Sequence, residues 1–174
     1  MQLNIPDDSL VVLVGPSGAG KSTFAAKHFR TTEIVSSDRC RALVADRETD
    51  LKATPAAFRV LHSIATERLQ AGRLTVIDAT SVLAAARQPL IDLARKHERP
   101  AVAIVFDLPL DVCIERNSRR PERRLARRVI ERQHEQMKRS IGNLEVEGFA
   151  SVHSLSSVEA IETAVIVREV AANP

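Results

Sequence analysis

The sequence predicts an α/β fold, a three-layer sandwich in which a mostly parallel sheet lies between two layers of helices. Short continuous apolar runs, typical of buried parallel strands, alternate along the chain with longer segments that have helical apolar spacing. A glycine-rich stretch also stands directly between the first strong apolar run and a helix-forming segment. This alternation favours βαβ units, which place helices on both faces of a sheet.

The glycine-rich stretch, Gly15 to Thr23, reads GPSGAGKST and fills every fixed position of the phosphate-binding loop G-x-x-x-x-G-K-[ST]. Its glycines allow positive φ, so that backbone N–H groups can surround phosphate oxygens. We expect Lys21 to reach the β and γ phosphates of ATP or another nucleoside triphosphate, and Ser22 to contact Mg²⁺. The sequence therefore predicts a P-loop NTPase-type fold. The expected nucleotide contacts are Gly15, Ser17, Gly18, Ala19, Gly20, Lys21, Ser22 and Thr23.

Each expected strand is a short apolar run that ends near a turn or a polar residue. The expected strands are Leu3 to Ile5, Leu10 to Val14, Glu33 to Ser37, Leu74 to Ile77, Ala101 to Phe106 and Val152 to Leu155. Ligands of open parallel sheets bind beyond the carboxyl ends of the strands. The phosphate loop, Asp38 and Asp78 are therefore expected to lie together at that edge.

Each expected helix carries apolar residues at helical spacing. Thr54 and Pro55 are predicted to be the N-cap and the first helical position of one helix, and Gly72 to end it. The expected helices are Ser22 to Arg30, Arg39 to Ala45, Thr54 to Ala71, Leu83 to His97, Leu110 to Asn117 and Pro121 to Ser140. Residues 47–54 are expected to form a loop, and Ser157 to Val170 a helix or a strand.

Length and composition favour one domain over residues 1–174, which is large enough to bury a core. The chain has no apolar run long enough to span a membrane, and its first residues lack the basic and apolar regions of a signal peptide. We therefore expect a cytoplasmic protein with no membrane partner. Cys40 and Cys113 are isolated, so they are expected to be reduced structural thiols.

Positive charge is concentrated in one segment. Residues 116–139 contain ten Arg and Lys against three Glu, a net charge of +7, whereas the whole chain carries only +3. This distribution is typical of a site for phosphate-rich ligands, although a solvated basic helix face is an open alternative.

Two acids and one arginine are the candidates for chemistry beside the phosphate loop. Asp38 is the candidate general base that accepts the proton of an acceptor hydroxyl; an N-cap role for the helix at Arg39 is the alternative. Arg41 is expected to hold an anionic group of the acceptor, or otherwise to be a surface arginine. Asp78 is expected to bind Mg²⁺ directly or through water; the alternative is a structural carboxylate that hydrogen-bonds the phosphate-loop region or the nearby Thr80 and Ser81.

Four arginines surround Pro121, where one helix is predicted to break and another to begin. A helical pair of this kind is suited to a lid, expected over residues 116–139, that closes over the triphosphate and stabilises charge in the transition state. The arginines are Arg116, Arg120, Arg123 and Arg124. Arg116 and Arg120 are expected to contact the nucleotide, and Arg120 and Arg123 to act in catalysis. The alternative is a solvated stripe along one helical face, at the spacing of residues 116, 120, 123 and 127.

Five stretches in this order resemble the polynucleotide 5′-hydroxyl kinase module found at the N-terminus of bacterial end-healing and end-sealing enzymes. They are GPSGAGKST, SSDRCR at 36–41, VIDAT at 76–80, ERNSRRPERR at 115–124 and VIERQHEQM at 129–137. The resemblance covers nearly the whole chain. One departure is Ser81, where related modules often have Asn.

The resemblance implies transfer of the ATP γ-phosphate to the 5′-hydroxyl end of RNA or DNA in nucleic-acid repair. It implies phosphate and metal contacts for Lys21 and Ser22, the general base for Asp38, and a grip on the acceptor's terminal phosphodiester for Arg41. Arg116, Arg120 and Arg123 match lid arginines. Phosphatase and ligase modules are absent from the chain, so it is either an excised domain or a free-standing kinase.

Two other functions stay open. A small-molecule P-loop kinase of the sugar-acid or antibiotic type would share the loop, the base and the lid. A nucleotide-dependent switch or toxin-like module would bind ATP and a partner, but the sequence contains no segment suited to water activation. For a nucleic-acid acceptor, the absence of Trp and Tyr and the presence of only five Phe predict recognition through phosphates, with little base preference.

Overall fold

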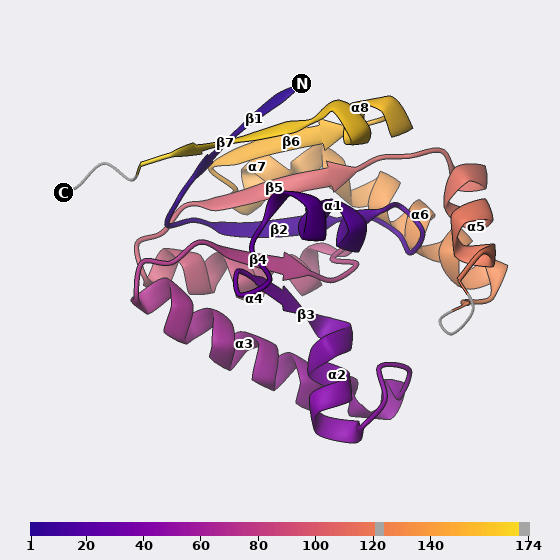
Figure 1. The fold of residues 1–174 in the computed structure, drawn as a ribbon, viewed down its shortest axis with the longest axis horizontal. Helices are drawn as coiled ribbons and strands as arrows, with labels where there is room; N and C mark the ends of the chain where they lie inside the picture. Colours follow the sequence, from indigo (N-terminus) through magenta and orange to yellow (C-terminus); the bar gives the residue numbers. More distant parts are fainter. Residues whose placement is uncertain (121–123, 171–174) are drawn as a thin grey trace.

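The computed structural model describes residues 1–120 and 124–170 of the 174-residue chain (Figure 1). Five parallel strands form the main sheet in the order β3-β4-β2-β5-β6. They are β2 (Leu10–Val14), β3 (Ile34–Ser36), β4 (Thr75–Asp78), β5 (Ala101–Phe106) and β6 (Ser151–Leu155). The sequence predicts all five, and each observed end lies within one residue of the expected one.

Helices cover both faces of this sheet, so the predicted three-layer α/β sandwich of the P-loop type is confirmed (Figure 1). The helices are α1 (Lys21–His28), α2 (Ser37–Ala45), α3 (Thr54–Gln70), α4 (Ala84–Lys96), α5 (Leu110–Ser118), α6 (Arg127–Ser140), α7 (Leu144–Glu147) and α8 (Val158–Thr163). Two short 3₁₀ turns, η1 (Leu51–Ala53) and η2 (Ile141–Asn143), precede α3 and α7.

The central strand β2 is fully buried and feeds two cores, because successive side chains of a strand point to opposite faces. Leu10, Val12 and Val14 pack in the core that contains α3 and α4. Val11 and Leu13 pack in the core that contains residues of α1, α5 and α8. The strand that leads into the phosphate loop is therefore held from both sides.

A second, two-stranded parallel sheet joins β1 (Gln2–Pro6) to β7 (Val165–Glu169). Leu3 and Ile5 are fully buried against the α1 side of the main sheet. The carboxyl-terminal segment, predicted as a helix or a strand, contains both, since α8 precedes β7.

The predicted N-cap role of Thr54 is wrong. Thr54 is the first helical residue, and Ala53 precedes it with helical backbone angles. The chain is already turning there, because η1 leads directly into α3 within the expected loop. Asp50 caps that earlier turn by accepting a hydrogen bond from the Lys52 N–H at 3.0 Å.

The helix predicted from Pro121 begins later, at Arg127. The Asn117 side chain donates to the Leu125 carbonyl oxygen at 2.9 Å and accepts from the Leu125 N–H at 3.2 Å. This paired contact ties residue 125 to the end of α5, so the helix starts only after Ala126, which has extended backbone angles. The predicted break at Pro121 lies outside the described residues.

The predictions about membrane spans and about the two cysteines can be compared with the structure. Among the described helices, none has both the length and the apolar character needed to cross a bilayer. Cys40 and Cys113 are free and buried, as the sequence predicts. Burial raises the pKa of both thiols above its ordinary value, which keeps them protonated.

Candidate active site

The phosphate loop lies between β2 and α1, at the carboxyl edge of the sheet. The strand order reverses at β2, because β4 and β3 lie on one side of it and β5 and β6 on the other. Gly18 and Gly20 have φ of 86° and 94°, which favours glycine at both positions. A Cβ at Gly18 would lie 2.1 Å from the Cys113 carbonyl oxygen, and one at Gly20 3.3 Å from Arg116 Nη1. Glycine therefore also allows α5 to pack directly on the loop.

Lys21 is the first residue of α1 and is only 7% exposed. Its Nζ donates to the carbonyl oxygens of Gly15 at 2.7 Å and Pro16 at 2.9 Å. These contacts hold the ammonium group across the loop. The amino end of α1 adds the positive end of its dipole, so the loop is suited to phosphate.

Three cavities meet at the loop. A small one of about 40 Å³ is lined by Ser17, Gly18, Gly20, Lys21, Ser22, Asp38, Asp78, Ala79, Thr80 and Arg120. One of about 300 Å³ is lined by Gly18, Gly20, Thr23, Phe24, Lys27, Arg116, Arg120, Ile161 and Glu162. We call the third, of about 320 Å³, the acceptor-side cavity; it is lined by Ser17, Asp38, Arg41, Glu48, Thr49, Leu51, Thr80, Arg120, Arg124, Leu125 and Gln133. Arg120 lines all three.

Asp38 and Arg41 lie together in the first turns of α2. Arg41 Nη1 donates to Asp38 Oδ1 at 2.5 Å and to the Glu48 carbonyl oxygen at 2.6 Å. The Arg41 side chain is only 11% exposed, so it is not a surface arginine. Burial lowers its pKa, and its Nε is buried with no hydrogen-bond partner among the described residues. The N-cap alternative for Asp38 is wrong, because Ser36 caps α2 by accepting from the Arg39 N–H.

Asp78 ends β4 and is 8% exposed, in the cavity it shares with Ser22 and Asp38. Carboxylate and hydroxyl oxygens are hard ligands that suit Mg²⁺. No group of three or more His, Cys, Asp and Glu that could hold a metal occurs among residues 1–120 and 124–170. Mg²⁺ usually needs only one or two carboxylates beside substrate phosphates, so the residues present fit this ion.

Gln133 joins α6 to the phosphate loop, a contact that sequence reasoning missed. Its Oε1 accepts from the Ser17 N–H at 2.9 Å, and His134 Nε2 contacts the Leu108 carbonyl oxygen one residue further. The spacing of apolar residues in this helix could have indicated the contact. Gln133 lies at helical spacing between the fully buried Ile130 and Met137, and a polar residue on an inward face usually has a partner.

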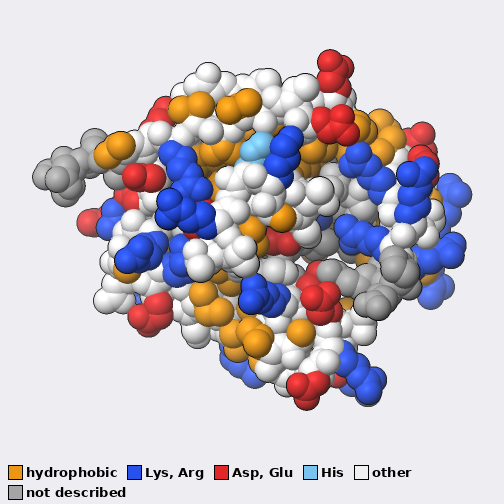
Figure 2. Space-filling view, in the orientation of Figure 1, with side chains coloured by type: hydrophobic (Ala, Val, Ile, Leu, Met, Phe, Trp, Pro, Cys, Tyr) orange, Lys and Arg blue, Asp and Glu red, His pale blue; other side chains and the backbone are white. Residues whose placement is uncertain are grey.

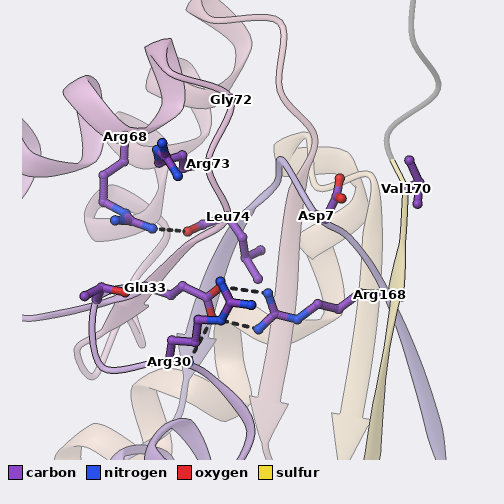
Figure 3. Close-up of a pocket in the computed structure, with 10 residues that line it drawn as sticks. Asp7, Arg30, Glu33, Arg68, Gly72, Arg73, Leu74, Arg168 and Val170 are labelled. Atoms are coloured by element: carbon purple, nitrogen blue, oxygen red, sulfur yellow. Dashed lines mark hydrogen bonds and ion pairs between the residues drawn. The ribbon is translucent and has the colours of Figure 1, made fainter.

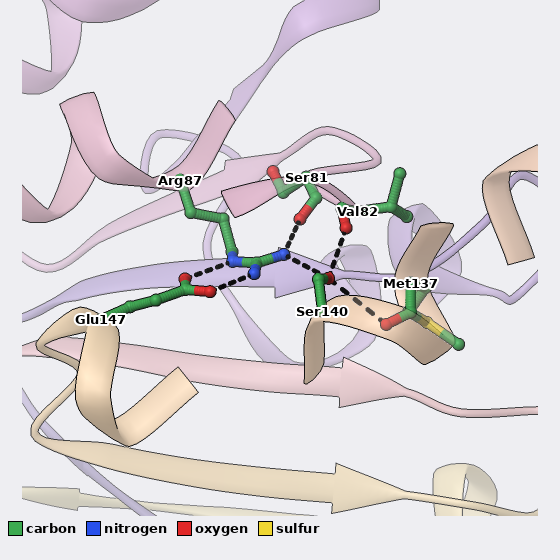
Figure 4. Close-up of polar contacts among 6 residues, drawn as sticks. All are labelled: Ser81, Val82, Arg87, Met137, Ser140 and Glu147. Atoms are coloured by element: carbon green, nitrogen blue, oxygen red, sulfur yellow. Dashed lines mark hydrogen bonds and ion pairs between the residues drawn. The ribbon is translucent and has the colours of Figure 1, made fainter. Parts of the chain in front are cut away.

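The loop after β4, which carries Thr80, is held by a buried polar cluster (Figure 4). Arg87 is completely buried, donates to the Ser81 carbonyl oxygen at 2.9 Å and pairs with Glu147 through two hydrogen bonds. Ser140, at the end of α6, donates to the Val82 carbonyl oxygen. Ser81 has φ of 46°, a left-handed conformation that Asn adopts more readily than Ser, and Asn is the usual residue here in the modules that the sequence resembles.

The structure brings two of the predicted lid arginines to the loop. Arg116 and Arg120 line the 300 Å³ cavity, and Arg124 lines the acceptor-side cavity. Because α5 ends at Ser118 and α6 begins at Arg127, these residues do not form the single helical stripe considered above. Arg123 lies outside the described residues.

Comparison with known proteins adds family and fold. Residues 10–144 match the family model described as AAA domain. A curated relative, transcription factor bHLH140 of Arabidopsis thaliana, is 32% identical over 111 residues, which are 64% of this chain and 11% of that protein.

Two solved structures show a similar fold. A chain of the Pnkp1/Rnl/Hen1 RNA repair complex is 24% identical with a TM-score of 0.68, over 81% of this chain and 47% of that one. APS kinase CysC of Mycobacterium tuberculosis, in complex with AMPPNP and APS, is 19% identical with a TM-score of 0.56, over 91% and 93%. The chain thus spans less than half of the repair protein and about a tenth of the curated relative.

Proposed function

The chain belongs to the AAA domain family and has the P-loop fold of kinases, and from this premise we propose that it is an ATP-dependent polynucleotide 5′-hydroxyl kinase. The observation that carries the proposal is the pairing of Asp38 with Arg41 in a cavity beside the phosphate loop. A carboxylate and a buried arginine at this place suit an acceptor that has both a hydroxyl and a phosphate.

In the proposed reaction, the 5′-oxygen of the acceptor forms a bond to the γ-phosphorus of ATP, and the bond from that phosphorus to the β–γ bridging oxygen breaks. Asp38 accepts the proton of the 5′-hydroxyl, and ADP leaves. Lys21 and Arg120 neutralise charge on the transferred group, since both line the small cavity with Asp38. Mg²⁺, held by Ser22 and Asp78, would neutralise further charge on the triphosphate.

Arg41 is proposed to bind the terminal phosphodiester of the acceptor. Its buried Nε has no hydrogen-bond partner among the described residues, and a phosphate oxygen would supply one. Arg120 and Arg124 add positive charge to the same cavity. No Phe is fully exposed, so base stacking contributes little and the strand end is recognised through its phosphates.

The likeness to a chain of an RNA repair complex supports a role in the repair of broken strands. We propose that the chain is one kinase domain, which acts either alone or beside phosphatase and ligase modules in a longer protein. Arg123 is proposed to join Arg116 and Arg120 in a lid over the nucleotide.

A small-molecule kinase is the second candidate. The acceptor-side cavity, of about 320 Å³, has a volume usual for small-ligand sites, and the fold is similar to APS kinase over 91% of the chain. Such an acceptor would be a compact alcohol of the sugar-acid or antibiotic type.

Label transfer from γ-labelled ATP separates the two candidates. We expect labelling of a short 5′-hydroxyl oligonucleotide, none of its 5′-phosphorylated counterpart, and none of sugar acids or aminoglycosides. Arg41→Gln is expected to raise the KM for the oligonucleotide about tenfold, because one charge-assisted contact is lost. Arg39→Gln, on the exposed side of the same helix, is the matched control. Labelling of a small alcohol alone would favour the second candidate.

A further inference from the structure

A cavity of about 620 Å³ lies at the opposite, amino-terminal edge of the main sheet (Figure 3). It is lined by Asp7, Arg30, Thr32, Glu33, Arg68, Gly72, Arg73, Leu74, Arg168 and Val170. Most of these residues lie just before β2, β3 or β4. Arg68 lies in the last turn of α3, and Arg168 and Val170 belong to or follow β7. Since the intervening strands rise about 3.3 Å per residue, the cavity is roughly 15 Å or more from the phosphate loop.

Four arginines and two acids give this lining a net charge of +2. Figure 2 shows Lys and Arg side chains at the left of the visible face, where β2, β4 and β5 begin in Figure 1, and others at the right. The arginines come from three separate parts of the chain, around residues 30, 68–73 and 168, so the fold brings these parts together.

The Glu33 carboxylate forms hydrogen bonds within the wall of the cavity. It receives two hydrogen bonds of 2.7 Å from Arg168 and one of 2.8 Å from the Arg30 N–H (Figure 3). Burial alone would raise its pKa, but the bonds from Arg168 and from the Arg30 backbone lower the pKa below its ordinary value. Glu33 therefore stays ionised and fixes Arg168 as part of the frame.

Arg68 differs from Arg168, because its guanidinium group hydrogen-bonds to a backbone carbonyl oxygen and not to a carboxylate. Its Nη2 donates to the Leu74 carbonyl oxygen at 2.7 Å, while its Nε is buried without a hydrogen-bond partner among the residues described. Burial lowers its pKa; the negative charge of Glu33 opposes this shift, and the positive charge of Arg73 adds to it. A bound anion between Arg68 and Arg73 would supply both the hydrogen-bond acceptor and the opposing charge.

We propose that this amino-edge cavity is a second anion site that binds a phosphate group, separate from the nucleotide site. Arg68 and Arg73 are its main contacts, and Arg30 completes the positive rim. A phosphate ester carries close to two negative charges at neutral pH, which matches the charge of the lining, and guanidinium groups bind phosphate in pairs of hydrogen bonds. The volume is sufficient for a nucleotide-sized ligand. The phosphate could belong to a free metabolite or to a nucleic-acid backbone.

Amide NMR of the ¹⁵N-labelled chain, titrated with inorganic pyrophosphate, tests this proposal. We expect two sets of amide signals to shift with separate saturation curves: one around Gly18 and Gly20, the other around Glu33, Gly72 and Arg73. Arg73→Gln, at an exposed position, should weaken the second saturation about tenfold and leave the first unchanged. Arg59→Gln, on an exposed part of α3 outside the cavity, is the matched control and should change neither.

A second titration, with a 5′-phosphorylated oligonucleotide, identifies the source of the phosphate. If the oligonucleotide saturates the second set of shifts at a lower concentration than pyrophosphate does, the site is assigned to a strand backbone. If pyrophosphate saturates it at the lower concentration, the site is assigned to a free phosphate compound. If neither pyrophosphate nor the oligonucleotide shifted the signals around Glu33, Gly72 and Arg73, the proposal would be overturned. So would equal weakening by Arg73→Gln and Arg59→Gln. Because the two sets are observed separately, the outcome does not depend on the kinase assignment.

Discussion

The two edges of the main sheet, for which we propose the same kind of ligand, differ in the groups that would bind it. At the carboxyl edge, one continuous loop supplies backbone N–H groups and Lys21, and side chains from other strands and helices surround it. At the amino edge, four arginines from three separate segments supply the positive charge. A backbone loop of this kind would bind a phosphate chain in one fixed geometry, whereas arginine side chains could adapt to phosphate on several ligands.

Each edge also has its own bidentate arginine–glutamate pair, and the two pairs differ in burial. Arg87 is fully buried and its partner Glu147 is 12% exposed. Arg168 is 34% exposed, with Glu33 at 8%. The carboxyl edge is thus supported by a buried ion pair behind the site, while the ion pair at the amino edge forms part of the cavity wall. We infer that the first pair supports the structure and that the second supports both the structure and the binding of anions.

The largest effect is expected from the arginine that lines all three cavities of the carboxyl edge. Arg120→Ala should lower the rate of phosphate transfer about 10³-fold, because it removes charge stabilisation in the transition state. Steady-state label transfer measures it. Arg119→Ala is the control, since Arg119 is 74% exposed and pairs with Glu115 at the surface. Similar losses in both variants would show that the segment acts only through its total charge.

The scaffold behind the carboxyl edge is tested by Arg87→Ala. We expect a loss of about 3 to 5 kcal/mol in the free energy of unfolding, because the largely buried Glu147 carboxylate loses its arginine partner. Urea denaturation measures this loss. Arg95→Ala, which breaks an exposed pair with Asp92 on the same helix, should cost no more than about 1 kcal/mol. A cost for Arg87→Ala as small as that would contradict the scaffold role.

The amino edge should respond less strongly, and in a way that depends on pH. Arg168→Gln is expected to lower the free energy of unfolding by about 1 to 3 kcal/mol at pH 7, because Glu33 loses two hydrogen bonds. The pKa of Glu33 is lower when folded than unfolded, so its pairing stabilises the fold above the ordinary value of 4.5. That contribution is lost as the pH falls through the folded pKa. Denaturation curves at pH 7 and pH 3 should therefore show a difference between variant and wild type that shrinks in acid.

Base identity should have the smallest effect. Four of the five Phe are buried and Phe58 is partly buried, so no exposed ring offers a stacking surface. Oligonucleotides that begin with A, C, G or T should differ by less than about threefold in kcat/KM, since stacking on one aromatic ring usually contributes more than this. A tenfold preference would show that another group reads the base.

Contiguity explains why the carboxyl edge could be predicted and the amino edge could not. The phosphate loop is a single stretch with fixed spacing, and Asp38 and Asp78 follow apolar runs, so their meeting at one edge follows from a parallel sheet. Arg30, Arg68, Arg73 and Arg168 have no common spacing. Arg168 reaches the cavity only because β7 pairs with β1, and nothing local in the sequence indicates a partner about 160 positions away.

The same reasoning accounts for errors at the ends of elements. The strands were predictable because burial on both faces gives continuous apolar runs. The start of α6 was not, since it depends on the side chain of Asn117 in α5 binding the backbone of Leu125, in the segment that precedes α6. The N-cap predicted for α3 is wrong for a similar reason, because η1 already turns the chain before Thr54.

The most direct test of the central claim is phosphate transfer by Asp38→Asn, which keeps the shape of the side chain and removes the base. We expect wild type to label a 5′-hydroxyl oligonucleotide, and Asp38→Asn to bind ATP normally while transfer falls at least about 10²-fold. Asp46→Asn, at the exposed end of the same helix, should retain full activity. Transfer by Asp38→Asn at the wild-type rate would contradict the account, because the carboxylate beside the phosphate loop would then have no part in the reaction.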